Sequence, residues 1–147
     1  MADDFIEAAV RRFEEKDNCA QALFSTFAQG MDLDEDTCLN LAEIFSGGVA
    51  RSGNVCGAIT GGLMAISLKY GKAGKTESSK RDAPTVNGLG ERFMNRFKHR
   101  NGTLLCKDLI GYDISTEEKL QTARENKAFS NCSRFVRDAG EILADIL

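Results

Sequence analysis

Apolar residues recur at helical spacing along most of the chain. Residues 4–15 carry Phe5, Ala9 and Phe13 on one face and acidic residues in the first turn, where the helix dipole favours them. A second helical segment is expected to begin near Asn18, a good N-cap residue, and to end at Gly30. A third is expected after residues 34–36, and its predicted apolar face consists of Leu33, Thr37, Leu41 and Ile44.

Residues 58–68 contain no charged residue and almost no polar one, so a helix here would be buried on all sides. Gly57, Gly61 and Gly62 would each cost such a helix about 1 kcal/mol relative to alanine. Glycines kept in a helix despite this cost usually let another backbone, or a ligand, come close. The pattern predicts a central, buried, glycine-rich helix that ends at residues 69–71.

The periodicity stops between residues 72 and 90, a stretch that contains the only proline, Pro84, and that predicts an exposed loop. Helical patterns resume at residues 89–99, at 103–110 with Thr103 as the cap, after a Ser115–Glu118 capping box, and from Ser133 to the end. We find no convincing strand pattern and no internal repeat. The predicted fold is therefore all-α, a compact helical bundle in which residues 1–147 form a single domain.

The composition agrees with a globular protein. A chain of 147 residues, 42% hydrophobic and 28% charged, can bury a core without disulfides or metals. The net charge of −3 argues against nucleic-acid binding. The basic run at residues 92–100 is interpreted as the solvated face of a helix, because Phe93 and Phe97 within it have i, i+4 spacing.

Two features predict a cytoplasmic protein without a membrane partner. The longest uncharged stretch, residues 52–68, is shorter than the ~20 apolar residues of a spanning helix. The chain begins Met-Ala-Asp-Asp, with acids where a secretory signal would carry basic residues. In the cytoplasm thiols stay reduced.

Five cysteines are present, and none lies in a Cys-x-x-Cys pair, which argues against a local thioredoxin-type or zinc-finger motif. Four of them fall at predicted helix starts: Cys19 after Asn18, Cys56 at the glycine-rich helix, Cys106 after Thr103, and Cys132 after Asn131. The first turn of a helix offers unpaired N–H groups and a partial positive charge, both of which stabilise a thiolate. Such cysteines serve as nucleophiles, redox groups or metal ligands.

A cysteine is also a common core residue, and this reading is open for each of the four. Cys38 differs from them, because it lies on an apolar helix face one turn before Leu41 and Ala42. We assign Cys38 to the core or its edge. A purely structural cysteine is expected on such a face, so four at helix starts favour a functional set.

Several runs resemble one known family. They are NCAQA at 18–22, FSGG at 45–48, CGAITGGLM at 56–64, CKDLIGYD at 106–113 and CSRFV at 132–136. In order and flanks they are similar to the C-GCAxxG-C-C family, whose description as redox-active rests on its cysteines. The resemblance covers nearly the whole chain and implies that Cys19, Cys56, Cys106 and Cys132 form one functional set, with Cys38 outside it.

Three functions remain open at this point. The first is a thiol redox protein in which pairs among Cys19, Cys56, Cys106 and Cys132 cycle between dithiol and disulfide. The second is a metal protein in which the same four cysteines bind zinc or an iron–sulfur cluster, with Gly57 and Gly61 leaving room for the cofactor. The third is a non-catalytic interaction module.

The sequence leaves the reaction, the substrate and the redox partner unidentified. The oligomeric state is also open, and a homodimer is one candidate. The single histidine, His99, lies among basic residues, where a solvated imidazole is the simpler interpretation, and it offers no Ser–His–Asp or Cys–His arrangement. Whether the protein is an enzyme is therefore not decided by its sequence.

Overall fold

The structure is a computed structural model that describes residues 2–72 and 85–147. These residues form eight helices, and their only β-pairing is an isolated antiparallel bridge between Val55 and Leu105. The all-α prediction is confirmed. The helices are α1 (Ala2–Glu15), α2 (Cys19–Phe27), α3 (Glu35–Glu43), α4 (Gly57–Tyr70), α5 (Val86–Asn101), α6 (Cys106–Ile110), α7 (Glu117–Glu125) and α8 (Cys132–Ile146).

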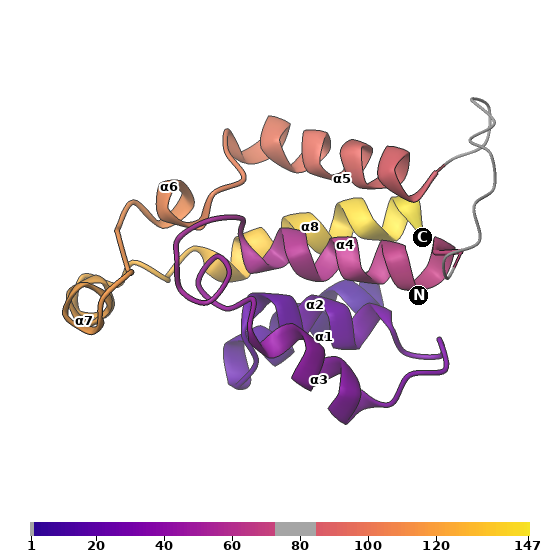
Figure 1. Cartoon of the computed structure of the whole chain (residues 1–147), viewed down its shortest axis with the longest axis horizontal. Coiled ribbons are helices and arrows are strands. Elements are labelled where there is room, and N and C mark those ends of the chain that lie inside the picture. The colour runs from indigo at the N-terminus through magenta and orange to yellow at the C-terminus, as the bar shows by residue number, and fades with distance from the viewer. Residues whose placement is uncertain (1, 73–84) are drawn as a thin grey trace.

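The helices lie in layers (Figure 1). α4 and α8 run side by side through the middle, α5 covers them on one side, and α1, α2 and α3 lie on the other. α4 and α8 begin at the same end of the molecule, and the short helices α6 and α7 extend from that end. The starts of two long helices are thereby brought to one region of the fold.

One main hydrophobic core joins α1, α2, α3, α4, α5 and α8. α4 contributes Ile59 and Ile66, and α8 contributes Val136, Ile142 and Leu143, all fully buried. A second, smaller cluster contains Cys106, Ile114, Leu120 and Ala123 and joins α6 to α7. Since burial of apolar side chains is the main favourable term in folding, this cluster is what holds α7 near the end of the bundle.

α5 begins earlier than expected. The sequence predicted a helix from about residue 89, but the helix starts at Val86, where the Thr85 side chain accepts a hydrogen bond from the Gly88 N–H at 2.9 Å. This is the usual geometry of a threonine N-cap. The predicted loop residues 73–84 lie outside the described part of the chain.

Two predicted caps are also displaced. α6 has Leu105 as its N-cap, while Thr103 accepts a hydrogen bond from the Leu105 N–H at 3.1 Å. α7 is capped by Thr116, one residue after the predicted Ser115, and its hydroxyl accepts from the Lys119 N–H at 3.1 Å. Adjacent Ser and Thr residues are both competent caps, so local sequence does not choose between them.

The predicted apolar face of α3 is wrong. Leu41 and Ile44 are 50% and 59% exposed, whereas Cys38 and Ala42 are buried. Of the other helices, only α2 makes extensive contacts with α3. Only a narrow stripe of the α3 surface is therefore covered. Cys38 and Ala42, four residues apart, form that stripe.

No helix among the described residues is long and apolar enough to cross a membrane.

Candidate functional site

All four cysteines singled out from the sequence lie at helix starts. Cys19, Cys106 and Cys132 are the first residues of α2, α6 and α8. Cys56 is the N-cap residue of α4 itself, with extended backbone angles of φ −54° and ψ 139°. At these positions the backbone N–H groups of the following residues have no partner within the helix, so they are available to a thiolate.

Cys19 is held in place by a capping box around its neighbour Asn18. The Asn18 side chain accepts a hydrogen bond from the Gln21 N–H at 2.9 Å, and the Gln21 side chain accepts one from the Asn18 N–H at 3.0 Å. The Asn18 amide also donates to the Glu43 carbonyl at 3.2 Å. The start of α2 is therefore tied to the end of α3, which limits the movement of Cys19.

Cys56 and Cys106 are positioned together by backbone pairing. The Cys56 N–H donates to the Leu104 carbonyl at 2.8 Å, and the Cys106 N–H donates to the Asn54 carbonyl at 2.7 Å. These two bonds flank the bridge between Val55 and Leu105. The pairing joins the segment before α4 to the segment before α6, although 50 residues separate the two cysteines.

Cys132 follows a turn that ends α7. Its N–H donates to the Phe129 carbonyl at 3.1 Å, and Lys127 within the turn has a positive φ of 55°. The N-cap residue Asn131 makes no side-chain cap hydrogen bond, so it does not cap α8 in the way that its residue type suggests. The backbone turn, rather than a capping side chain, places Cys132.

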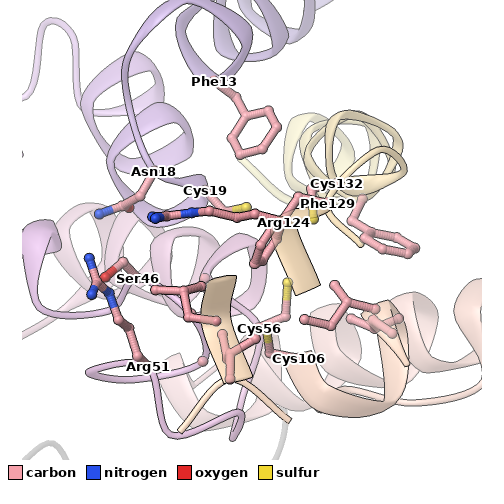
Figure 2. A pocket seen from close by; sticks show the side chains of 18 residues that line it. Phe13, Asn18, Cys19, Ser46, Arg51, Cys56, Cys106, Arg124, Phe129 and Cys132 are labelled. Atoms are coloured by element: carbon pink, nitrogen blue, oxygen red, sulfur yellow. The ribbon is translucent and has the colours of Figure 1, made fainter. Parts of the chain in front are cut away.

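The four cysteines line one cavity of about 260 Å³ (Figure 2). Most of its other walls are apolar and come from α1, α6, α7, α8 and the connections that flank α7. The apolar lining residues are Phe13, Leu109, Ile110, Ile114, Leu120, Phe129 and Phe135. A cavity with an apolar wall and a few polar groups is typical of a small-molecule site.

Cys19 lies between two other cysteines. Its thiol is close enough to the sulfur of Cys56 and to that of Cys132 for side-chain hydrogen bonds to both. Those bonds, together with burial of the thiol, raise the pKa of Cys19 well above its usual range. Cys19 therefore stays a thiol that donates to its neighbours.

The pKa of Cys56 is shifted in the opposite direction to that of Cys19. The hydrogen bond from the Cys19 thiol is the largest cause that lowers the pKa of Cys56, and the backbone N–H groups of Ala58 and Ile59 lower it further, while burial opposes them. The helix start thus stabilises a thiolate at Cys56, as expected for a cysteine at this position. A thiol of lowered pKa beside a thiol of raised pKa suits disulfide exchange, because the first is the better source of the attacking thiolate.

Cys106 lines the same cavity but is held as a thiol. Burial, followed by the nearby sulfurs of Cys56 and Cys132, raises the pKa of Cys106 to about 12. Cys106 is 8% exposed and belongs to the smaller apolar cluster. Two cysteines at helix starts thus have pKa values shifted in opposite directions. Desolvation is the largest cause at Cys106, and hydrogen bonding is the largest cause at Cys56.

Cys38 does not line the cavity. Its side chain is 1% exposed and lies in the main core. Burial, together with the charges of Asp34 and Glu35, raises the pKa of the Cys38 thiol. It is a buried core thiol in α3.

One element of the site has no counterpart in the sequence analysis. Residues 47–51 all have positive φ angles between 49° and 72°, which makes a left-handed turn. Three of these residues are Val49, Ala50 and Arg51, for which such angles cost roughly 1–2 kcal/mol each. Ser46, Gly47, Gly48 and Arg51 line the cavity from this turn. The Gly47–Gly48 pair was the available signal, and it indicates only that a turn begins.

Gly48 fixes the distance between this turn and Cys106. A Cβ atom on Gly48 would lie 2.6 Å from the Asn54 carbonyl oxygen and 2.7 Å from the Cys106 Cβ. No side chain fits there without displacing the segment that leads to Cys56. The absence of a side chain at residue 48 thus lets the turn, Cys106 and the start of α4 meet at one place.

The two glycines expected to leave room for a cofactor have different surroundings. Gly57 lines the cavity, and a Cβ there would lie 3.1 Å from the Cys19 Cβ. Gly61 does not line it, since a Cβ there would lie 2.6 Å from the carbonyl oxygen of Ala20 in α2. The room beside Gly61 is taken by the backbone of α2 rather than left for a cofactor.

Metal ligation was the alternative role for the four cysteines. Within residues 2–72 and 85–147, no group of three or more His, Cys, Asp or Glu side chains is arranged to hold a metal ion.

The fold and the site define an all-α protein with several thiols at helix starts around one apolar cavity. Residues 17–146 match the family described as "Putative redox-active protein (C_GCAxxG_C_C)", and the chain belongs to this family. The membership confirms the resemblance found in the sequence and supports a general redox-related role.

A relative is found in Archaeoglobus fulgidus, where it is described as "Uncharacterized protein". It is 30% identical to this chain over 113 residues, which cover 69% of this chain and 70% of the relative. No solved structure matches the chain.

Proposed function

We propose that this protein carries out thiol–disulfide exchange, with Cys56 as the nucleophile and Cys19 as the thiol that completes the exchange. The observation that carries this proposal is that Cys19 and Cys56 line the same cavity at the starts of α2 and α4, where a Cβ on Gly57, next to Cys56, would lie 3.1 Å from the Cys19 Cβ. The lowered pKa of Cys56 supports it, because the thiolate is the form that attacks a disulfide.

The exchange has two steps. The Cys56 thiolate attacks one sulfur of a substrate disulfide, forms a mixed disulfide and releases the other half of the substrate as a thiolate. The Cys19 sulfur then attacks the Cys56 sulfur, releases the remaining half and leaves a Cys19–Cys56 disulfide. The proton of Cys19 passes to one released thiolate, and the other takes a proton from solvent. Two electrons move from the protein to the substrate.

The other two cysteines have supporting roles in this proposal. Cys132 contacts Cys19 as well, so it offers Cys19 a second disulfide partner. Cys106 stays protonated and contributes to the cavity wall. The cytoplasm suits such chemistry, because its reducing conditions return the disulfide to the dithiol.

The test uses bis(2-hydroxyethyl) disulfide, which is small and uncharged. The wild-type protein is expected to release both halves and to carry no adduct, while Cys19→Ser is expected to retain one hydroxyethylthio group on the peptide that contains Cys56. Cys56→Ser should form neither product. The matched control is Cys38→Ser, which removes a thiol that does not line the cavity and should behave as wild type.

Peptide mapping by mass spectrometry reads out the adduct, and circular dichroism checks that each variant is folded. An adduct retained on Cys106 or Cys132 in the Cys19→Ser protein would contradict the assignment of Cys56 as nucleophile. Full exchange activity in Cys56→Ser would contradict the proposal as a whole.

A second candidate function is a metal or iron–sulfur centre. It is favoured by the fact that four cysteine side chains, the usual ligand count for zinc and for iron–sulfur clusters, line one cavity. Cys19, Cys56, Cys106 and Cys132 would be the ligands, with Gly57 next to the bound group, and their side chains would have to move together, because no three of them are arranged to hold a metal ion as they stand in the described residues. Such a centre would supply structural stability or one-electron transfer.

Absorption and metal content of a single protein preparation distinguish thiol exchange from a metal or iron–sulfur centre. Protein purified without oxygen is expected to be colourless and free of stoichiometric metal if thiol exchange is its function. Absorption between 300 and 500 nm together with bound iron, both lost in Cys56→Ser, would instead establish the cluster. If the protein neither exchanges disulfides nor binds metal, it is a non-catalytic interaction module.

A further inference from the structure

Cys56 lines the cavity and is only 5% exposed, so its sulfur is recessed from the outer surface. A disulfide within a folded protein partner cannot bring its sulfur to such a recessed atom without opening the bundle. A small molecule that enters the cavity can. The burial of Cys56 therefore selects for a low-molecular-weight substrate.

The cavity limits the size and polarity of that substrate. Its volume of about 260 Å³ is larger than the ~150 Å³ engineered cavity that holds one benzene molecule. It is far smaller than a peptide of several residues would need. Phe13, Phe129 and Phe135 contribute aromatic wall, so the body of the substrate is apolar.

The charged residues of the cavity are all basic. Arg51 and Arg124 line it, and none of the described lining residues is Asp or Glu. Figure 2 shows the nitrogen-bearing ends of Arg51, Arg124 and Asn18 toward the left of the view, and the four sulfurs nearer its centre. In this view the basic groups lie to one side of the thiols.

These guanidinium groups are not neutralised by strong ion pairs. Arg124 has no carboxylate partner among the residues that the structure describes. Among the residues that the structure describes, Arg51 is paired with Glu117 alone, at 3.9 Å between two well-exposed side chains, a type of contact that contributes little. Both groups are available to an anionic group on a bound molecule, and arginine suits a carboxylate because two N–H groups donate in parallel.

We propose that the substrate is a small organic disulfide with an apolar body and one carboxylate, with Arg124 and Arg51 binding the carboxylate and the disulfide lying at Cys56. This inference rests on the proposed exchange function and adds the class of substrate. The reaction is the one written above: the substrate disulfide becomes a dithiol while Cys19 and Cys56 become a disulfide. It runs in either direction according to the relative reduction potentials of the two couples.

The test compares two probes that differ only in charge. Lipoate is a cyclic disulfide with an aliphatic chain and a carboxylate, and lipoamide is the same molecule with an uncharged amide. Stopped-flow absorbance at the dithiolane band follows reduction by the dithiol protein. A charge-assisted bidentate contact predicts at least a roughly tenfold preference for lipoate.

Arginine variants show where the preference arises. Arg124→Gln and Arg51→Gln are expected to lower the rate constant for lipoate much more than that for lipoamide, and so to reduce the preference. The control Arg92→Gln removes the same charge from an exposed position on α5 that does not line the cavity, and should retain the preference. Equal rates with lipoate and lipoamide in the wild type would overturn the substrate class, while the exchange function would stand.

A second readout does not depend on exchange. Octanoate, which contains no sulfur, is expected to protect Cys56 from alkylation by iodoacetamide, and octanamide is expected to protect it at least tenfold less effectively. Arg124→Gln should remove the difference. Protection by octanoate without reduction of any disulfide would retain the binding site and refute the exchange function. Failure of octanoate to protect Cys56 would overturn the inference.

Discussion

Val55 pairs with Leu105 in an isolated antiparallel bridge, and each of these residues is followed by a cysteine at the start of a helix. The bridge brings Cys56 and Cys106 to the same cavity through backbone hydrogen bonds, which do not depend on the side chains of the bridging residues. A substitution at Val55 or Leu105 would therefore alter the site less than one at the glycine that the bridge packs against, Gly48.

Oxidation is expected to produce disulfides that contain Cys19. With one equivalent of diamide, the product should be Cys19–Cys56, with Cys19–Cys132 as the second species, because Cys19 contacts both sulfurs. Tryptic mapping of the unreduced protein identifies the pairs. A disulfide that includes Cys38 in the folded protein would contradict the geometry, since that residue lies in the main core away from the cavity.

The cavity thiols should differ in their pH dependence of alkylation. The pKa of Cys56 is lowered by the Cys19 hydrogen bond. As the pH is raised, its alkylation rate should therefore reach a plateau before pH 9, the ordinary pKa of a cysteine thiol. The pKa of Cys106 is raised to about 12, so its rate should still rise tenfold per pH unit above pH 9. Residue-specific rates by mass spectrometry check this. Parallel profiles for the two residues would refute the assignment.

The free energy of unfolding should fall at alkaline pH because folding raises the pKa of buried thiols such as Cys106. Below pH 9 the Cys106 thiol is protonated in both the folded and the unfolded chain, so its stabilising effect is fully present. Between pH 9 and about 12 the unfolded chain loses this proton and the folded chain keeps it, which favours unfolding. Urea unfolding at pH 7, 9 and 10 should show the loss, and Cys106→Ser should show a shallower one. Identical pH dependence in both proteins would contradict the shift.

Gly61→Ala is expected to destabilise the fold by roughly 2 kcal/mol, although alanine is the better helix former, because overpacking a close contact costs ~1–3 kcal/mol. The added Cβ would lie 2.6 Å from the Ala20 carbonyl oxygen, which belongs to a helix backbone and cannot move alone. The matched control is Gly140→Ala in α8, where the nearest atom would be 3.6 Å away, in ordinary contact. Gly140→Ala should be neutral or stabilising. Equal effects at the two sites would show that α2 and α4 are not in close backbone contact.

Ala50→Gly is expected to raise the free energy of unfolding by up to about 1 kcal/mol. Ala50 has a φ of 49°, and glycine removes the cost of that left-handed conformation, partly offset by its greater freedom in the unfolded chain. The same substitution at Ala144, in the right-handed helix α8, should lower it by about 1 kcal/mol. Chemical denaturation compares the two variants, and a loss at both positions would contradict the left-handed turn at residues 47–51.

The sequence by itself determined most helices and the position of each candidate cysteine within them. Capping residues and apolar periodicity are local properties. Asn18 therefore predicts the start of α2, and the uncharged stretch of residues 58–68 predicts α4. The selection of Cys19, Cys56, Cys106 and Cys132 followed from such positions and from the resemblance in their flanking residues. Exact boundaries were less accessible, as at Thr116 and Val86, because neighbouring residues could cap equally well.

The tertiary structure alone decided which cysteines meet at the cavity and in which direction the pKa of each of Cys19, Cys56 and Cys106 is shifted. Cys56 and Cys106 have similar local positions. Burial is nevertheless the main cause that raises the pKa of Cys106, while hydrogen bonds from Cys19, Ala58 and Ile59 lower that of Cys56. Leu41 and Ile44 have the spacing of a core face but are exposed, because only α2 packs extensively on α3. Contacts between segments far apart in the chain, such as Gly61 against Ala20, depend on how the helices assemble, and periodicity within one segment carries no information about its neighbour.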